Sequence, residues 1–87
     1  MTKYAKVTSE EWTQITEGVN AYFEVFSPGG FVQLYFDDNP PAPDVPVYWT
    51  ISADRGGFDY KLGKNCYARA QRFIDGREQT ELVMWEE

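Results

Sequence analysis

Short runs of aromatic and β-branched residues, separated by turn sequences, are the feature that most restricts the fold of this chain. The clearest runs cover residues 21–26, 31–36 and 47–52, and residues 65–73 and 80–86 form two further ones. Runs of this length and composition are typical of β-strands. Sequences rich in Gly, Pro, Asp and Asn, which favour turns, lie at Ser27–Gly30, Asp37–Asp44, Asp54–Gly57, Leu62–Asn65 and Asp75–Arg77. The pattern predicts an all-β fold, a small antiparallel β-sandwich or barrel of about six to eight strands.

The runs also predict which side chains point inward. Successive side chains of a strand point to opposite faces, so each run divides into two sets. One set is apolar throughout and is expected to form the core: Phe23, Val25, Val32, Leu34, Phe36, Val47, Trp49 and Ile51. The opposite set mixes polar residues with large aromatic ones.

Residues 8–19 fit two different structures. Thr8–Glu11 fits the capping box of a helix, and Trp12, Ile15 and Val19 follow at nearly helical spacing. The threonines within this segment are poor helix formers. Because every other segment is β, we expect a strand over Trp12–Thr16, and one short N-terminal helical turn is the alternative.

Size and composition exclude several classes of protein. With 87 residues and no apparent linker, the chain is expected to form a single β-sandwich domain over residues 1–87. It has no His, which excludes His-ligated metals and His-based nucleophile pairs. Its one cysteine, Cys66, alternates with Ala68 and Ala70, which predicts a buried, unreactive thiol. We therefore expect a protein that is not an enzyme and has no catalytic residue, cofactor or metal site. With no signal sequence or apolar span, it is expected to be soluble in a reducing compartment.

The charge is distributed unevenly along the chain. The net charge is −6, and residues 7–54 contain eight acidic residues and neither Lys nor Arg. A phosphate-backbone binder needs a basic face, so this distribution argues against nucleic acid as a partner. It permits a basic protein partner, and it is equally compatible with a solvated acidic face. Asp37, Asp38, Asn39 and Asp44 gather oxygen atoms in one loop, but their spacing does not match a calcium loop and they are ordinary turn residues.

The outward-pointing aromatic residues form the candidate binding surface. A fold this small has room for one apolar face of each strand, and exposed aromatic patches usually mark contact surfaces. The candidate interface residues are Trp12, Tyr22, Phe26, Phe31, Tyr35 and Tyr48. The alternative is that the protein's own loops wrap across both faces.

The order of these segments carries a resemblance. Trp12–Gly18 is followed by an aromatic hairpin, the Pro-rich loop, the segment Gly57–Ala70 and a last strand that ends with Leu82–Glu86. This order resembles that of the small β-sandwich accessory proteins of tailed-bacteriophage virions, which serve as head-decoration, head-fibre or tail-associated modules. The chain departs from that pattern at Cys66 and Tyr67, and in the longer, charged segment Arg72–Gln79.

The resemblance implies a structural role. It implies a virion location after synthesis in the host cytoplasm, with no membrane association. The implied partners are further copies of the chain, in a homo-oligomer such as a trimer, and another virion protein. The resemblance does not identify any residue of this chain as a site residue.

Two other functions fit the sequence. The stretch without Lys or Arg is compatible with a small acidic inhibitor, a nucleic-acid mimic that acts on a host defence protein. Trp12, Trp49 and Trp85 could stack on sugar rings in a carbohydrate-binding module.

Overall fold

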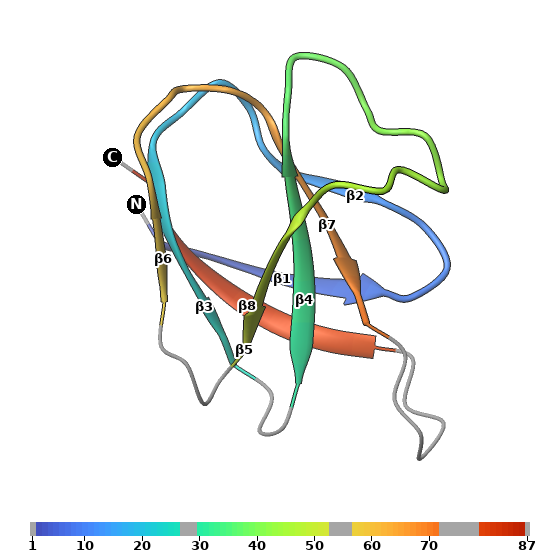
Figure 1. Cartoon of the computed structure of the whole chain (residues 1–87). Helices are drawn as coiled ribbons and strands as arrows, with labels where there is room; N and C mark the ends of the chain where they lie inside the picture. Colours follow the sequence, from blue (N-terminus) through green and yellow to red (C-terminus); the bar gives the residue numbers. More distant parts are fainter. Residues whose placement is uncertain (1, 27–29, 53–56, 72–78, 87) are drawn as a thin grey trace.

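The computed structural model describes residues 2–26, 30–52, 57–71 and 79–86, and these residues form eight β-strands and no helix (Figure 1). The strands are β1 (Thr2–Thr8), β2 (Thr13–Thr16), β3 (Ala21–Val25), β4 (Phe31–Phe36), β5 (Trp49–Ser52), β6 (Phe58–Tyr60), β7 (Cys66–Ala70) and β8 (Gln79–Glu86). The all-β prediction is therefore confirmed. Within the described part of the chain there is no helix that could cross a membrane.

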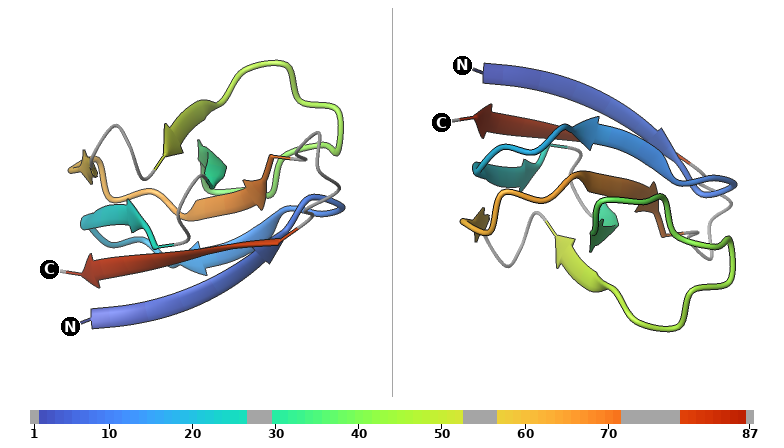
Figure 2. Two further views of the ribbon diagram at one scale, coloured as in Figure 1. Left: turned by 90° about the horizontal axis from the view of Figure 1, so that it is seen from below. Right: turned by 90° about the horizontal axis from the view of Figure 1, so that it is seen from above.

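The strands form two antiparallel sheets. Sheet A has the order β1-β8-β3-β6, and sheet B has the order β2-β7-β4-β5. The pairs β1–β8, β2–β7, β3–β6 and β4–β5 are nested and alternate between the sheets, which is the arrangement of an eight-stranded jelly roll. In Figure 2, β1 and β8 lie side by side at one margin of the molecule and β5 lies at the opposite margin. A sandwich, rather than a barrel, is the architecture.

The core lies between the two sheets. Phe23 and Leu82 of sheet A and Val32 and Leu34 of sheet B are completely buried. Phe36 stacks on Tyr60 with ring centroids 3.8 Å apart, and it also stacks on Phe58 at 5.6 Å. These three rings extend the core toward the margin of the sandwich where β4 and β6 face each other. The inward positions predicted at 23, 25, 32, 34, 36 and 51 are confirmed, with Phe36 partly buried.

The prediction for residues 47–52 is wrong in part. The strand begins only at Trp49, and Val47 is 74% exposed in the loop before it. Trp49 pairs with Leu34 and contacts the Phe58 ring at 5.5 Å, yet it is 60% exposed. β5 is the edge strand of sheet B, and the strand opposite, β6, has only three residues. Too little of sheet A extends over this edge to bury the indole.

Most of the remaining boundaries follow the sequence. The segment that fitted either structure is a strand, Thr13–Thr16, with no helical turn. Gly18 and Gly63 follow β2 and β6 with φ of +64° and +69°, a backbone region that favours glycine. The expected strand over residues 65–73 is described as Cys66–Ala70. The turns expected at Ser27–Gly30, Asp54–Gly57 and Asp75–Arg77 lie wholly or largely outside the described residues.

Candidate functional site

The outer face of sheet A carries an aromatic surface. Strand register places Tyr22 beside Trp85, and it places Tyr4 and Glu24 on either side of Val83. These positions alternate with core residues, so their side chains point away from sheet B. We call this surface the sheet A face; it comprises Tyr4, Tyr22, Phe26, Val83 and Trp85.

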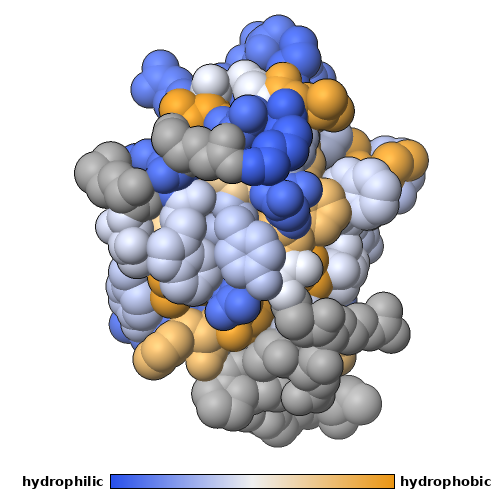
Figure 3. Space-filling view, turned by 90° about the vertical axis from the view of Figure 1, so that its left-hand side faces the viewer, coloured by the Kyte–Doolittle hydropathy of each residue, from blue (hydrophilic) through white to orange (hydrophobic). Residues whose placement is uncertain are grey.

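The rings of the sheet A face contact one another in pairs. Tyr4 and Phe26 meet edge to face at 6.0 Å, and Tyr22 lies 5.6 Å from Trp85. Phe26 is 62% exposed, Tyr4 57% and Trp85 41%. Figure 3 views the side of the molecule where β6, β3 and the chain ends lie, and side chains of intermediate and hydrophobic character are interspersed there with hydrophilic ones. The contacts among these rings leave much of their surface open to solvent.

Two carboxylates fix the phenols of this surface. The Tyr22 hydroxyl donates a hydrogen bond to Glu24 Oε1 at 3.0 Å, and this bond raises the pKa of Tyr22. A hydrogen bond to Glu81 likewise raises the pKa of Tyr4. Both phenols therefore stay neutral at physiological pH, and the sheet A face combines apolar rings with carboxylates.

The outer face of sheet B is different because the Pro-rich loop between β4 and β5 is attached to it. The Arg69 guanidinium donates from Nε to Gln33 Oε1 at 2.9 Å and from Nη1 to the Pro43 carbonyl at 2.7 Å. It also lies 4.4 Å from the centroid of the Trp12 ring. Gln33 and Tyr67, which point outward from sheet B, are buried. The protein's own loop thus covers part of this face.

A hollow opens between this loop and the segment before β2. It measures about 230 Å³, and we call it the Trp12 groove. Its lining residues are Glu10, Glu11, Trp12, Pro40, Pro41 and Pro43. The Trp12 ring contacts Tyr35 at 6.2 Å and Tyr48 at 6.1 Å. The Tyr35 hydroxyl donates to Asp37 Oδ2 at 3.3 Å, and partial burial together with Asp37 raises the pKa of Tyr35.

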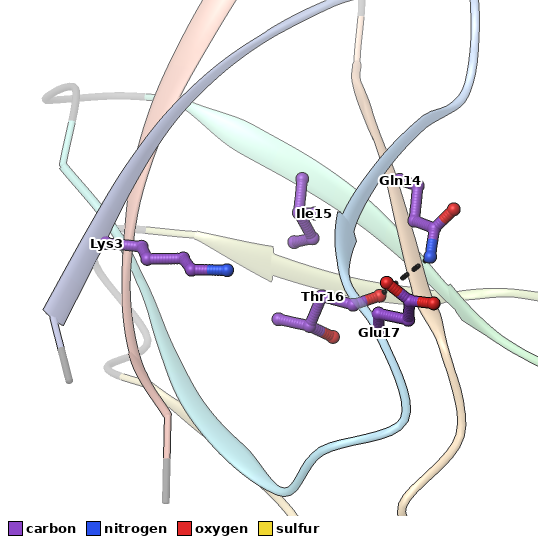
Figure 4. A pocket seen from close by; sticks show the side chains of 5 residues that line it. All are labelled: Lys3, Gln14, Ile15, Thr16 and Glu17. Carbon is purple, nitrogen blue, oxygen red and sulfur yellow. Dashed lines mark hydrogen bonds between the residues drawn. The ribbon is translucent and has the colours of Figure 1, made fainter.

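A third feature is an opening between the sheets on the side where β1 and β2 form the edges (Figure 4). It measures about 260 Å³ and is lined by Lys3, Gln14, Ile15, Thr16 and Glu17. Lys3 points inward from β1, and its Nζ forms an ion pair with Glu86 Oε1 at 2.8 Å. The charge of Lys3 is thus compensated within the fold. An inward-pointing lysine protects an edge strand against pairing with another strand, and we assign it that role.

Five of the six candidate interface residues fall into two groups. Trp12 lines the Trp12 groove and contacts the rings of Tyr35 and Tyr48, whereas Tyr22 and Phe26 belong to the sheet A face. Phe31 lies on β4, on the outer side of sheet B, and is partly buried.

Three residues of these surfaces, Trp85, Tyr4 and Arg69, were not among the six candidate interface residues. The sequence named Trp85 only as a possible sugar-stacking residue. Trp85 alternates with Leu82 and Met84, so the same period of two could have identified it. Tyr4 lies on β1, whose two lysines gave no indication of a strand. Arg69 could be placed on the outward side of β7, but its loop partner could not.

Neither Cys66 nor Lys64 is an activated nucleophile. Cys66 is fully buried, and burial raises the pKa of its thiol, which keeps it protonated. Asp38 forms an ion pair with Lys64 at 3.0 Å, a bond that raises the pKa of Lys64. Across residues 2–26, 30–52, 57–71 and 79–86, no group of three Cys, Asp or Glu side chains is placed to hold a metal ion.

We expect the stability of the fold to decrease as pH rises above about 9. The folded state raises the pKa of Cys66, so the native protein keeps a proton that the unfolded chain releases. Each proton released only on unfolding lowers the free energy of unfolding by about 1.4 kcal/mol per pH unit. Tyr4, Tyr22 and Tyr35 add to the same trend above pH 10.0, the ordinary pKa of tyrosine.

Urea unfolding at pH 7, pH 9 and above measures this effect. The Cys66→Ala variant should be less stable at pH 7 and should show a flatter pH dependence. An equally steep decrease in that variant, or fast reaction of native Cys66 with a thiol reagent, would contradict the assignment.

Comparison with protein-family models, with curated proteins and with solved structures finds no match to this chain. The resemblance to phage accessory proteins therefore rests on the sequence order alone, and the functional argument rests on the surfaces described above.

Proposed function

We propose that this protein is a non-enzymatic structural module that assembles through the sheet A face. The resemblance of its sequence points to a tailed-phage virion, where it would serve as a decoration, fibre-anchoring or tail-associated protein. Its partners there would be further copies of the chain and another virion protein. The observation that carries the proposal is the set of exposed, mutually contacting rings on the outside of sheet A.

The size of this surface suits an interface. Aromatic side chains are enriched in the cores of protein interfaces, and each can bury about 150–250 Å². A standard interface buries about 800 Å² per partner. The accessible surface of the chain is 5261 Å², so such an interface would take roughly one seventh of it. The sheet A face with its carboxylate rim can supply an area of that order.

The fold is compatible with this role and does not decide it. Jelly rolls occur in viral capsid proteins and also in lectins, and a shared fold does not imply a shared function.

The geometry gives less support to the two other functions. Glu24 accepts a bond from Tyr22, Asp38 is paired with Lys64, and Glu10 lines the groove, so these acids do not form one uncompensated row. The three tryptophans considered for sugar binding do not form one platform. Trp85 lies on the sheet A face, Trp49 at the β5 edge, and Trp12 beneath Arg69.

Sedimentation equilibrium of the purified protein tests the proposal. We expect a defined oligomer at micromolar concentration, and the double variant Phe26→Glu/Trp85→Glu should weaken association at least about 100-fold. Val47→Glu is the control, because Val47 is even more open to solvent than Phe26 and Trp85 but lies outside the sheet A face. A monomer at about 100 µM, or equal association in the double variant, would overturn the assembly role. Mass spectrometry of purified virions then tests the location. If the protein were absent from every particle, the proposed virion location would be overturned.

A further inference from the structure

The Trp12 groove is a second surface, separate from the sheet A face. Its lining residues come from the segment between β1 and β2 and from the β4–β5 loop. Three of its residues are prolines, whose rings fix φ and which lack a backbone donor. On the side formed by the prolines, the groove is therefore apolar and rigid. Its volume of about 230 Å³ is below that of a typical pocket for a drug-sized ligand, and it suits a single side chain.

The charge at the groove is negative and uncompensated by the described residues. Glu10 and Glu11 are exposed at its rim, and no described basic side chain forms an ion pair with either. The segment from 7 to 54, which supplies every lining residue, has no Lys or Arg. The cation that is present, Arg69, already donates to Gln33 and Pro43. The groove is therefore complementary to an additional cation.

The Trp12 ring favours a guanidinium over other cations. Arg69 already stacks at 4.4 Å from its centroid, so this indole accepts a planar cation within the fold itself. Arg is less strongly hydrated than Lys and pairs with carboxylates through two parallel donors. Its aliphatic stem can pack along proline rings while its charged end stays near water.

From these three properties we propose that the Trp12 groove binds an arginine side chain presented by an extended peptide segment of a partner protein. The guanidinium pairs with Glu10 and Glu11, and the stem lies along Trp12 and the prolines. Together with the sheet A face, the groove would let one subunit join its own copies and capture a basic segment of another protein.

Titration of the full-length, ¹⁵N-labelled chain with a blocked Gly-Gly-Arg-Gly-Gly peptide tests this inference. The reporter is the Trp12 indole N–H, which has no hydrogen-bond acceptor among the described residues and is assigned with Trp12→Phe. We expect a saturable shift of this signal with a Kd of about 0.1–1 mM. The same peptide with citrulline, which has the shape of Arg but no charge, should bind at least about 10-fold more weakly. High salt should weaken the binding of the Arg peptide by a similar factor.

The double variant Glu10→Gln/Glu11→Gln should weaken binding of the Arg peptide about 10-fold. Glu17→Gln is the matched control, because it removes one exposed carboxylate that lines the inter-sheet opening instead. Equal binding of the citrulline peptide, or no shift at about 10 mM peptide, would overturn the inference. A shift with maltohexaose and none with the Arg peptide would overturn it in favour of a glycan. Repeating the titration on Phe26→Glu/Trp85→Glu separates this result from the assembly role, since binding should persist there.

Discussion

Replacing Phe23 with alanine should lower the free energy of unfolding by about 3–5 kcal/mol. Phe23 is completely buried in the middle of β3, and its ring lies 6.0 Å from that of Phe36 on the opposite sheet. Removing it leaves a cavity between two sheets that are hydrogen-bonded and cannot easily collapse. A domain of this size has roughly 5–10 kcal/mol of stability, so urea denaturation at 25 °C should show a protein close to unfolding.

Phe26→Ala is the matched control for this prediction. It removes the same atoms three residues later in the chain, from a side chain that is 62% exposed on the sheet A face. Because little of that ring leaves water on folding, the loss should be below about 1 kcal/mol. If both variants lost equal stability, the assignment of Phe23 to the core and of Phe26 to the sheet A face would be wrong.

Replacing Arg69 with alanine should lower the free energy of unfolding by about 2–3 kcal/mol and release the Pro-rich loop. Two hydrogen bonds from a charged donor and the stacking on Trp12 are lost together. Gln33, which is buried, then loses the donor to its side-chain amide oxygen. Hydrogen exchange should become faster at the Val45 amide, which donates to the Ala42 carbonyl within this loop.

Two variants isolate the cause. Lys64→Ala removes an ion pair to Asp38, near the start of the same loop, but this pair is exposed, so its loss should cost much less stability than the loss of Arg69. Arg69→Lys keeps the charge but cannot donate in two directions from one plane, so it should lose most of the stability that Arg69→Ala loses. Full stability in Arg69→Lys would show that charge alone attaches the loop.

The fold was largely predictable because most of its strands show a local alternation of apolar and other residues. In β3 and β4 the period of two correctly identified Phe23, Val25, Val32 and Leu34 as core residues. The same alternation gave a wrong prediction at β5. Trp49 is at a position expected to point inward, but it lies at a sheet edge with little of the other sheet opposite it. The alternation did not reveal β6, which is only three residues long, or β1, whose lysines make it look like a polar loop.

The candidate site was less predictable, because its two surfaces combine residues distant in sequence. The sequence identified Tyr22 and Phe26 as outward-facing, but it did not pair them with Trp85 and Tyr4 from the two ends of the chain. That pairing depends on β8 lying between β1 and β3, which is a property of the topology.

The sequence by itself determined the β class of the chain, most inward positions and the absence of a histidine-based site, because alternation and composition are local properties. Only the tertiary structure decided which aromatic face stays open. Both sheets have outward-facing aromatic residues, and the outer face of sheet B is partly covered by the loop that contains Pro43, which Arg69 holds from 26 positions along the chain. A contact between residues so far apart depends on the pairing of β7 with β4 in sheet B and on the path of the β4–β5 loop, and no local sequence pattern records it.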